Sequence, residues 1–337
     1  MKNENCKNTL FINYGGIGDE ILFLPVISGF KKLYPKSKIT LCLEPRAKGI
    51  KNLTDLIDDV IEVDIKAKGF KKYFNILNLI FKTWSNNFDT IISSGKSPLV
   101  ALILFLSKAK TKIGYKTKTS FLLSHSVKLN QNQYAGYMYF DLISPFEKVD
   151  FEIPEIKHDE NFELPYGVCN KEYILIHPGV SLMSIQKGIY KCPESNFWIS
   201  LIKELLINNK VLLAGGPDDK KIIDEITRNK EISDNPNFYS MFNKTKNLYQ
   251  MAGLIKKSKR MICCDSAPFH LGVSLNTDIT VIFGPTNENK LVFKRDNIKV
   301  VKKDLACRPC LWDERTENCQ ASFCLNVSKE DVLNTVE

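Results

Sequence analysis

The chain repeats one pattern twice, and this repetition constrains its fold more than any single motif does. In each half, short apolar segments that predict buried strands alternate with longer segments that predict helices. A strand, a helix and a second strand in this order imply a right-handed crossover between parallel strands. Two such series in 337 residues predict an α/β protein with two Rossmann-like domains facing a central cleft.

In the first half, the expected strands are at residues 9–13, 39–43, 60–63 and 90–92, and the expected helices at residues 19–33, 73–83 and 99–107. In the second half, the expected strands are at residues 173–177, 210–214, 260–264 and 279–283, and the expected helices at residues 194–208, 218–228, 247–257 and 267–275. Between the two series, acidic residues with Pro154 and Pro165 predict a linker. We therefore expect domains at residues 1–155 and 170–300, followed by a cysteine-rich segment and a C-terminal helix at residues 301–337.

Composition places the chain among globular proteins and suggests its compartment. It is 44% hydrophobic and 25% charged, as soluble domains are. The longest apolar run, residues 98–106, is far shorter than the roughly 20 residues that a membrane span needs. The polar N-terminus has no secretory signal. We therefore expect a cytoplasmic protein.

The net charge of +9 comes entirely from the first half of the chain. Residues 1–150 hold 22 basic and 13 acidic side chains, whereas residues 151–337 hold 25 of each. The lysines gather in two clusters, Lys66, Lys68, Lys71 and Lys72 and then Lys108, Lys110, Lys112, Lys116 and Lys118. Such clusters are either a solvated face or a surface for an anionic partner. Because no aromatic residues alternate with the lysines in an RNP-like pattern, we expect an anionic glycolipid at the inner membrane, with peripheral association there, rather than nucleic acid.

A glycine-rich turn, Gly15-Gly16-Ile17-Gly18-Asp19, follows the first expected strand. Glycine lets the backbone approach a ligand closely, but this spacing is neither the dinucleotide fingerprint nor a P-loop. Asp19 opens a helix at the carboxyl end of the strand, where open α/β sheets bind ligands. It is therefore either a residue that caps the helix or a general base.

Four expected strands of the second half end in small or turn-forming residues. The turns are His177-Pro178-Gly179-Val180-Ser181, Gly215-Gly216-Pro217, Asp265-Ser266-Ala267-Pro268-Phe269-His270 and Gly284-Pro285-Thr286. In the third turn a helix begins, and its free N–H groups favour an anion such as a diphosphate, unless Asp265 or Ser266 simply caps it. Lys187 and Lys191 follow the first turn and can neutralise phosphate. Four such turns at one sheet edge predict a pocket for a nucleotide sugar or a dinucleotide.

These motifs, in this order, resemble those of glycosyltransferase family 9, the heptosyltransferases. The matching segments are residues 15–19 with Pro25, residues 177–179, residues 215–217, residues 265–270 and residues 283–286. The resemblance spans residues 9 to about 287 and implies a GT-B fold. It also implies an inverting, metal-independent transfer of a sugar, typically heptose from ADP-heptose, onto a hydroxyl of an acceptor such as lipopolysaccharide core.

The resemblance also assigns roles to individual residues. It implies an N-terminal acceptor domain with Asp19 as general base in the loop of Gly15, Gly16 and Gly18. It implies a C-terminal domain that binds the nucleotide-sugar donor, where our candidate residues are Ser181, Lys187, Lys191, Gly215, Gly216, Asp265, Ser266, Ala267, His270 and Gly284.

The chain departs from the family pattern at one loop. The family usually has Lys-x-Trp-Pro after His-Pro-Gly, and alignment on Pro193 puts Tyr190 at the lysine and Cys192 at the tryptophan. Lys187 or Lys191 is then the candidate for the diphosphate contact. The motifs leave open a different nucleotide sugar, a protein acceptor, and a family member that only binds or scaffolds.

Four cysteines, Cys307, Cys310, Cys319 and Cys324, lie within eighteen residues near the C-terminus. Four thiolates at this spacing suit a tetrahedral zinc or iron site. The alternatives are four reduced cysteines or two disulfides. Some members of the resembling family carry an iron-binding finger in this region. Because the family's chemistry needs no metal, we expect any ion to be structural and no cofactor to take part in catalysis.

Overall fold

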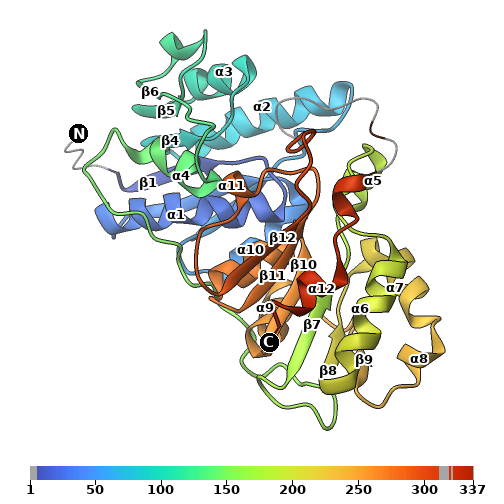
Figure 1. The fold of residues 1–337 in the computed structure, drawn as a ribbon. Helices are drawn as coiled ribbons and strands as arrows, with labels where there is room; N and C mark the ends of the chain where they lie inside the picture. Colours follow the sequence, from blue (N-terminus) through green and yellow to red (C-terminus); the bar gives the residue numbers. More distant parts are fainter. Residues whose placement is uncertain (1–5, 311–318, 320–321, 337) are drawn as a thin grey trace. The chain divides into compact units, whose positions relative to one another are not determined.

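The chain divides into two compact units, Met1–Pro154 and Glu155–Glu337. The computed structural model describes residues 6–310, 319 and 322–336. Each unit contains one parallel six-stranded sheet with helices packed on it (Figure 1). This confirms the expected α/β class with two Rossmann-like units.

In the first unit, the strand order is β3-β2-β1-β4-β5-β6. The strands are β1 (Asn8–Ile12), β2 (Lys38–Leu43), β3 (Asp59–Glu62), β4 (Thr90–Ser93), β5 (Thr111–Tyr115) and β6 (His125–Val127). The helices are α1 (Ile17–Leu33), α2 (Phe70–Ser85), α3 (Pro98–Leu106) and α4 (Ala135–Phe140), with 3-10 segments η1 (Pro45–Leu53), η2 (Ser120–Leu122) and η3 (Asp141–Ile143).

The alternation along β1 decides which helix covers which face of the first sheet. Phe11 makes edge-on ring contacts with Phe23 and Phe30 of α1. Leu10 and Ile12 point to the opposite face, into a core that α2 and α3 complete. Because both faces are covered, the central strands β1 and β4 are buried at nearly every position.

In the second unit, the strand order is β12-β11-β10-β7-β8-β9. The strands are β7 (Tyr173–His177), β8 (Lys210–Leu213), β9 (Phe238–Ser240), β10 (Arg260–Cys264), β11 (Ile279–Phe283) and β12 (Ile298–Lys302). The helices are α5 (Leu182–Gln186), α6 (Ser195–Asn208), α7 (Lys220–Thr227), α8 (Lys230–Ser233), α9 (Leu248–Lys257), α10 (Ala267–Ser274), α11 (Glu288–Leu291) and α12 (Lys329–Leu333), with η4 (Pro217–Asp219) and η5 (Phe323–Leu325).

The two sheets have the same topology, and it fixes where each can bind a ligand. The first strand of each unit, β1 or β7, is central, and the next two strands add on one side of it. The fourth strand, β4 or β10, then pairs on the other side. The carboxyl ends of β1 and β4, and of β7 and β10, are therefore topological switch points, where open α/β sheets bind ligands.

The expected elements occur with small shifts, and several shorter ones were not expected. The helix expected at residues 218–228 is divided into η4 and α7, because Gly216 caps a tight turn ahead of Pro217. Strands β6 and β9 have three residues each and no fully buried position, so they carry little apolar signal. Among the described residues, no helix combines the length and the apolar character that crossing a bilayer requires.

Candidate functional site

The turn after β1 holds Asp19 by its backbone. Gly16 is the residue before α1, and its N–H donates to Asp19 Oδ2 at 2.7 Å. A Cβ on Gly15 would lie 2.1 Å from the Cβ of Asp19, so only glycine fits there. Gly18 lies in the first turn of α1. The aspartate thus has the geometry of a helix cap, which fixes the position of its carboxylate.

Two neighbours of Asp19, Glu20 and Tyr139, have raised pKa values. Glu20 is fully buried, its Oε1 accepts from the Gly15 N–H at 3.3 Å, and burial raises the pKa of its carboxyl well above the usual value. The pKa of the Tyr139 phenol, in α4, is also raised, mainly by burial and to a lesser degree by Asp19. Both groups therefore favour their neutral forms more strongly than they would in water.

One cation, Arg46, lies beside the same turn, and a second, Lys66, shares its carboxylate partner. A Cβ on Gly16 would lie 3.6 Å from Arg46 Nη2, which places the guanidinium next to the glycine turn. Glu44, buried at the end of β2, pairs with Arg46 at 3.1 Å and with Lys66 at 2.7 Å. The sequence analysis placed Lys66 in a surface cluster and missed Arg46, because an isolated arginine after a strand has no distinguishing pattern.

In the second unit, the turns after β7 and β10 meet at the switch point. Cys264 Sγ lies 3.6 Å from the carbonyl oxygen of Pro178, across the two adjacent strands. Asp265 follows β10 and is buried, and Lys191 Nζ lies 2.8 Å from its Oδ2. The loop that follows β7 therefore places Lys191 against the Asp265 carboxylate at the end of β10.

The structure distinguishes the two candidate lysines by position. Lys191 is half-buried against Asp265, whereas Lys187 is exposed at the end of α5 and has no ion pair with any residue that the structure describes. Burial alone would raise the pKa of the Asp265 carboxyl, but Lys191 and then His270 lower it below its usual range. Asp265 is thus an anion that holds Lys191 in place.

The start of α10 has no side-chain cap among the described residues. Ser266 occupies the capping position, but its hydroxyl donates to the Cys264 carbonyl at 3.3 Å instead of accepting from the helix. Ala267 is the first helical residue, and His270, one turn later, is buried beside Phe269. This helix start keeps the positive end of its dipole, which an anion can use. Pro268 has no N–H, and the Phe269 N–H donates to the Ser266 carbonyl at 3.1 Å.

A second aspartate, which the sequence analysis did not single out, lies after β8. Asp219 Oδ2 accepts from the Gly216 N–H at 2.8 Å and lies 3.6 Å from His177 Nε2. A Cβ on Gly179 would lie 1.7 Å from Asp219 Oδ1, and one on Gly215 would lie 3.0 Å from the Asp219 Cβ. Gly215 of the predicted donor site and Gly179 of the His-Pro-Gly turn thus pack closely against Asp219.

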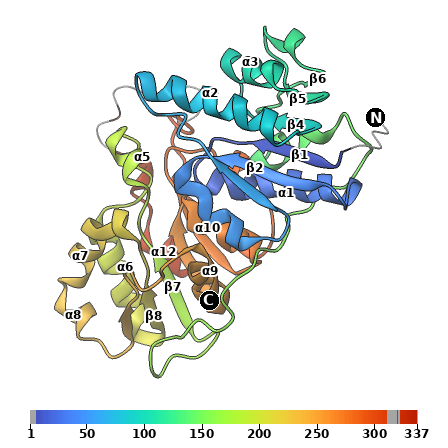
Figure 2. The ribbon, with the colours of Figure 1, turned by 180° about the vertical axis from the view of Figure 1, so that it is seen from behind.

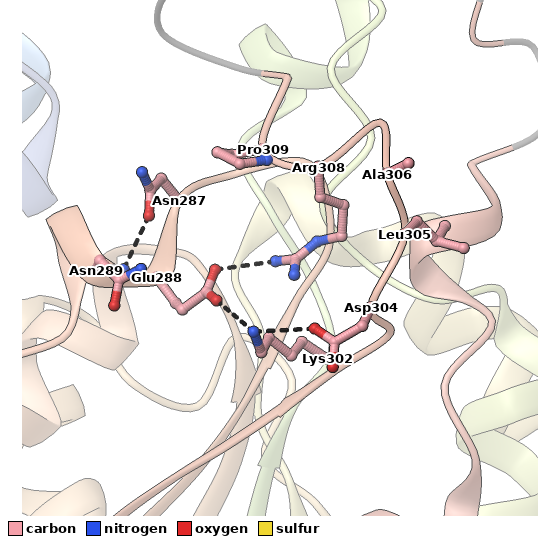
Figure 3. Close-up of a pocket in the computed structure, with 9 residues that line it drawn as sticks. All are labelled: Asn287, Glu288, Asn289, Lys302, Asp304, Leu305, Ala306, Arg308 and Pro309. Atoms are coloured by element: carbon pink, nitrogen blue, oxygen red, sulfur yellow. Dashed lines mark hydrogen bonds and ion pairs between the residues drawn. The ribbon is translucent and has the colours of Figure 1, made fainter.

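The turn after β11 is covered by the C-terminal segment. A Cβ on Gly284 would lie 2.5 Å from Leu325 Cδ2 and 3.6 Å from Cys324 Sγ. Arg308 donates from Nε to the Gly284 carbonyl at 2.6 Å and pairs with Glu288 at 3.1 Å. Figure 3 shows Arg308 and Lys302 pointing to the same Glu288 carboxylate, at a pocket of about 380 Å³.

The four cysteines do not converge on one point in the described part of the chain. Cys310 donates its N–H to the Pro285 carbonyl at 3.0 Å, and Cys324 is buried against the same turn. Burial and then Cys310 and Cys319 raise the pKa of the Cys324 thiol. Cys307 and Cys319 are exposed, and all four thiols are free. No three His, Cys, Asp or Glu side chains among the described residues lie close enough to share a metal ion.

The remaining predicted residue, Ser181, is exposed at the start of α5. Most of the candidate donor residues therefore lie at one sheet edge, after the adjacent strands β8, β7, β10 and β11. A buried ion pair, an uncapped helix start and closely packed glycine turns meet there. Such an edge suits a ligand that carries a diphosphate.

Comparisons with known proteins agree with this chemistry. The sequence profile of "Glycosyltransferase family 9 (heptosyltransferase)" matches residues 77–321. Lipopolysaccharide heptosyltransferase 3 of Escherichia coli K12 is 26% identical over 292 residues, which cover 80% of each chain. The solved structure of E. coli ADP-heptose lipopolysaccharide heptosyltransferase II has a TM-score of 0.72 at 16% identity and covers 98% of both chains. The iron-containing dodecameric glycosyltransferase TibC of enterotoxigenic E. coli has a TM-score of 0.58 at 13% identity, with 98% of this chain and 75% of that chain covered.

Proposed function

The chain belongs to glycosyltransferase family 9, the heptosyltransferases, and from this premise we propose that it transfers a heptose from ADP-heptose to a hydroxyl of a lipopolysaccharide-type acceptor. The observation that carries the proposal is the family match over residues 77–321, which contains both Lys191 and Asp265. The curated relative with this activity, from E. coli, supports the choice of donor and acceptor class.

The second unit supplies the donor site of this proposal. Lys191, held by Asp265 at 2.8 Å, would contact a diphosphate oxygen through a charge-assisted hydrogen bond. The uncapped start of α10 would face the same diphosphate with the positive end of its dipole. These positive groups would stabilise the charge that develops on the departing ADP.

The first unit supplies the base. Asp19 would take the proton of the acceptor hydroxyl while that oxygen forms a bond to the anomeric carbon, and the bond from this carbon to ADP breaks with its electron pair leaving on ADP. One displacement of this kind inverts the anomeric centre. Arg46 and Lys66, both paired with Glu44, would contact anionic groups of the acceptor.

Titration calorimetry with ADP-heptose, UDP-sugars and GDP-sugars tests the donor, and mass detection of the product tests transfer. We expect binding of ADP-heptose and an added heptose mass on a heptose-deficient core acceptor. Preferential binding of a UDP- or GDP-sugar would replace the donor in the proposal. No binding of any nucleotide sugar at millimolar concentration would overturn the enzymatic function.

A structural zinc or iron ion at Cys307, Cys310, Cys319 and Cys324 is a separate proposal. It is supported by the spacing and by the proximity of Cys310 and Cys319 to Cys324. Exposed Cys307 and Cys319 would have to turn toward Cys324 to complete the ligand set. Elemental analysis of the purified chain should find about one ion per chain, as a four-thiolate site binds, and Cys324→Ser should lose it. A metal-free protein prepared under reducing conditions would leave four ordinary thiols.

We also propose that the protein works in the cytoplasm at the inner membrane leaflet, where a glycolipid acceptor would be met. The basic first half of the chain supports this location.

A further inference from the structure

The outward face of α2 is apolar, although it faces solvent. Its inward face is ordinary, with Ile76, Leu79 and Ile80 buried in the core of the first unit. The outward side chains are large and exposed: Phe70 (85%), Tyr73 (66%), Phe74 (59%), Leu77 (65%), Phe81 (65%) and Trp84 (42%). A surface helix of a globular domain normally carries polar residues on this side.

These side chains form one continuous patch with α3. Their spacing of three or four residues places them along one side of a helix. Trp84 Nε1 donates to the carbonyl of Leu106 at the end of α3 at 2.8 Å, which joins the two helices. Leu102, Phe105 and Leu106 extend the exposed apolar surface there. Figure 2 shows α2 and α3 side by side on the outside of the first sheet. Contiguous apolar patches of this kind mark interaction sites.

The patch lies in the most basic part of the chain. Residues 65–140 contain twelve lysines and one acidic residue, Asp89. Twelve less one gives +11 for this segment against +9 for the whole chain, so the rest of the chain is slightly acidic. The charges touch the patch directly, since Lys108 Nζ lies 5.5 Å from the centre of the Trp84 ring.

An apolar patch surrounded by lysines fits one kind of binding partner better than the others. In a two-fold contact with a second copy, the same basic surface would face itself, and α2 has no acidic residue to neutralise that charge. An anionic lipid surface supplies both complements, phosphate groups for the lysines and an acyl boundary for the aromatic rings. Stable attachment to a membrane needs such a pair of signals.

We propose that α2 and α3 form a membrane-docking surface whose aromatic side chains enter the headgroup boundary of an anionic leaflet while the surrounding lysines bind lipid phosphates. The inference rests on the proposed function in one respect, because it names the surface by which the enzyme would reach a glycolipid acceptor. Donor binding at the second unit does not depend on it.

Vesicle co-sedimentation of the full chain tests the proposal. We expect binding to phosphatidylethanolamine–phosphatidylglycerol vesicles, weak binding to phosphatidylcholine vesicles, and weakening by salt. The double variant Phe74→Gln/Phe81→Gln should bind at least ten-fold more weakly, because each ring contributes through its buried area. The matched control is Ile207→Gln, an exposed apolar residue of α6 in the other unit (67%), which should bind as the wild type does.

Two further readouts separate the outcomes. Charge reversal at Lys71→Glu/Lys72→Glu should also abolish binding, while ADP-heptose affinity stays at the wild-type level in every variant. Absence of vesicle binding with intact ADP-heptose binding would overturn the docking surface and leave the proposed function standing. A concentration-dependent dimer that the Phe74→Gln/Phe81→Gln variant loses would assign the patch to a second copy and overturn the membrane. If the wild type bound vesicles but failed to bind ADP-heptose, the result would overturn the proposed function and leave the docking surface standing.

Discussion

The turns Gly15–Asp19 and Gly215–Asp219 are nearly the same piece of backbone in two units. In each, a strand ends in two glycines, and an aspartate three residues after the second glycine accepts that glycine's N–H, at 2.7 Å in the first and 2.8 Å in the second. In each turn the first glycine, Gly15 or Gly215, lies against the Cβ of the aspartate that follows. Capping therefore cannot distinguish a catalytic aspartate from a structural one.

The surroundings of the two carboxylates do distinguish them. Asp219 is buried beside His177, and burial raises the pKa of its carboxyl while it lowers that of the imidazole. Asp19 is half-buried, and burial raises the pKa of its neighbours Glu20 and Tyr139. The second carboxylate is thus enclosed in the protein's interior, whereas the first stays partly exposed, as the proposed general base has to be.

The largest expected effect is on kcat, where substitution of Asp19 and of Asp219 should have different consequences. Asp19→Asn keeps an oxygen that can accept the Gly16 N–H but removes the base, so kcat should fall about 100- to 10,000-fold with ADP-heptose affinity unchanged. Asp219→Asn is the matched variant, and its kcat should fall less than ten-fold. Steady-state kinetics with both variants checks this. Equal losses in the two, with both folded, would contradict the assignment of the base.

The next largest effect is on ADP-heptose affinity, which should depend on a lysine of the second unit. Lys191→Ala should weaken ADP-heptose binding about 10- to 100-fold, because a hydrogen bond to a charged group contributes roughly 1.5–3 kcal/mol. Lys187→Ala, in the same loop but exposed, is the control and should change the affinity less than three-fold. Titration calorimetry measures both. A larger effect from Lys187 would assign the diphosphate contact to the other lysine.

A third effect tests whether the second turn is structural. Gly179→Ala would place a Cβ 1.7 Å from Asp219 Oδ1, so the unfolding free energy should drop by about 1–3 kcal/mol. Gly216→Ala meets no atom within 4 Å, and its stability should stay within about 0.5 kcal/mol of the wild type. Denaturant unfolding gives both values. A stable Gly179→Ala variant would show that Asp219 is free to move.

The smallest effect concerns pH at the first turn. The folded-state pKa of Glu20 is raised above its usual 4.5, so the folded protein holds a proton that the unfolded chain releases above that pH. Stability therefore falls as pH rises from 4.5 toward the folded pKa. Glu20→Gln removes this loss, and its advantage over the wild type should be absent near pH 4 and grow toward pH 7. The unfolding free energy of both proteins is measured at several pH values. A difference between them that does not change with pH would show that Glu20 is solvated.

The sequence predicted β1 to β4 in the first sheet and β7, β8, β10 and β11 in the second, and it missed β5, β6, β9 and β12. Of the missed strands, β6, β9 and β12 lie at sheet edges, whereas β5 lies inside the first sheet. Central strands such as β7 and β10 are apolar at almost every position, which is a strong local signal. Strands β9 and β12 lie at the edges of the second sheet and are only partly buried. The glycine turns were predicted for the same reason, since a tight turn after a strand depends on local backbone geometry.

Partners that come from distant parts of the chain could not be predicted in this way. The sequence left Lys187 and Lys191 as equal candidates, although they are four residues apart, because the deciding partner, Asp265, is 74 residues away. The contact of Arg46 with the Asp19 turn and the pairing of His177 with Asp219 were missed for the same reason. The helix at residues 73–83 was expected, but only burial shows that its aromatic residues face solvent while its aliphatic ones fill the core.

The sequence by itself thus determined the two α/β units, the turns at the ends of their central strands, and the family to which the chain belongs. These depend on interactions between near neighbours in the chain, namely the alternation of apolar residues and the space that glycine leaves. The tertiary structure decided which lysine pairs with Asp265, which of two capping aspartates is buried beside a histidine, and which face of α2 meets water. Those properties depend on the order of strands within each sheet, and on the burial and charge that this order imposes on side chains far apart in the sequence.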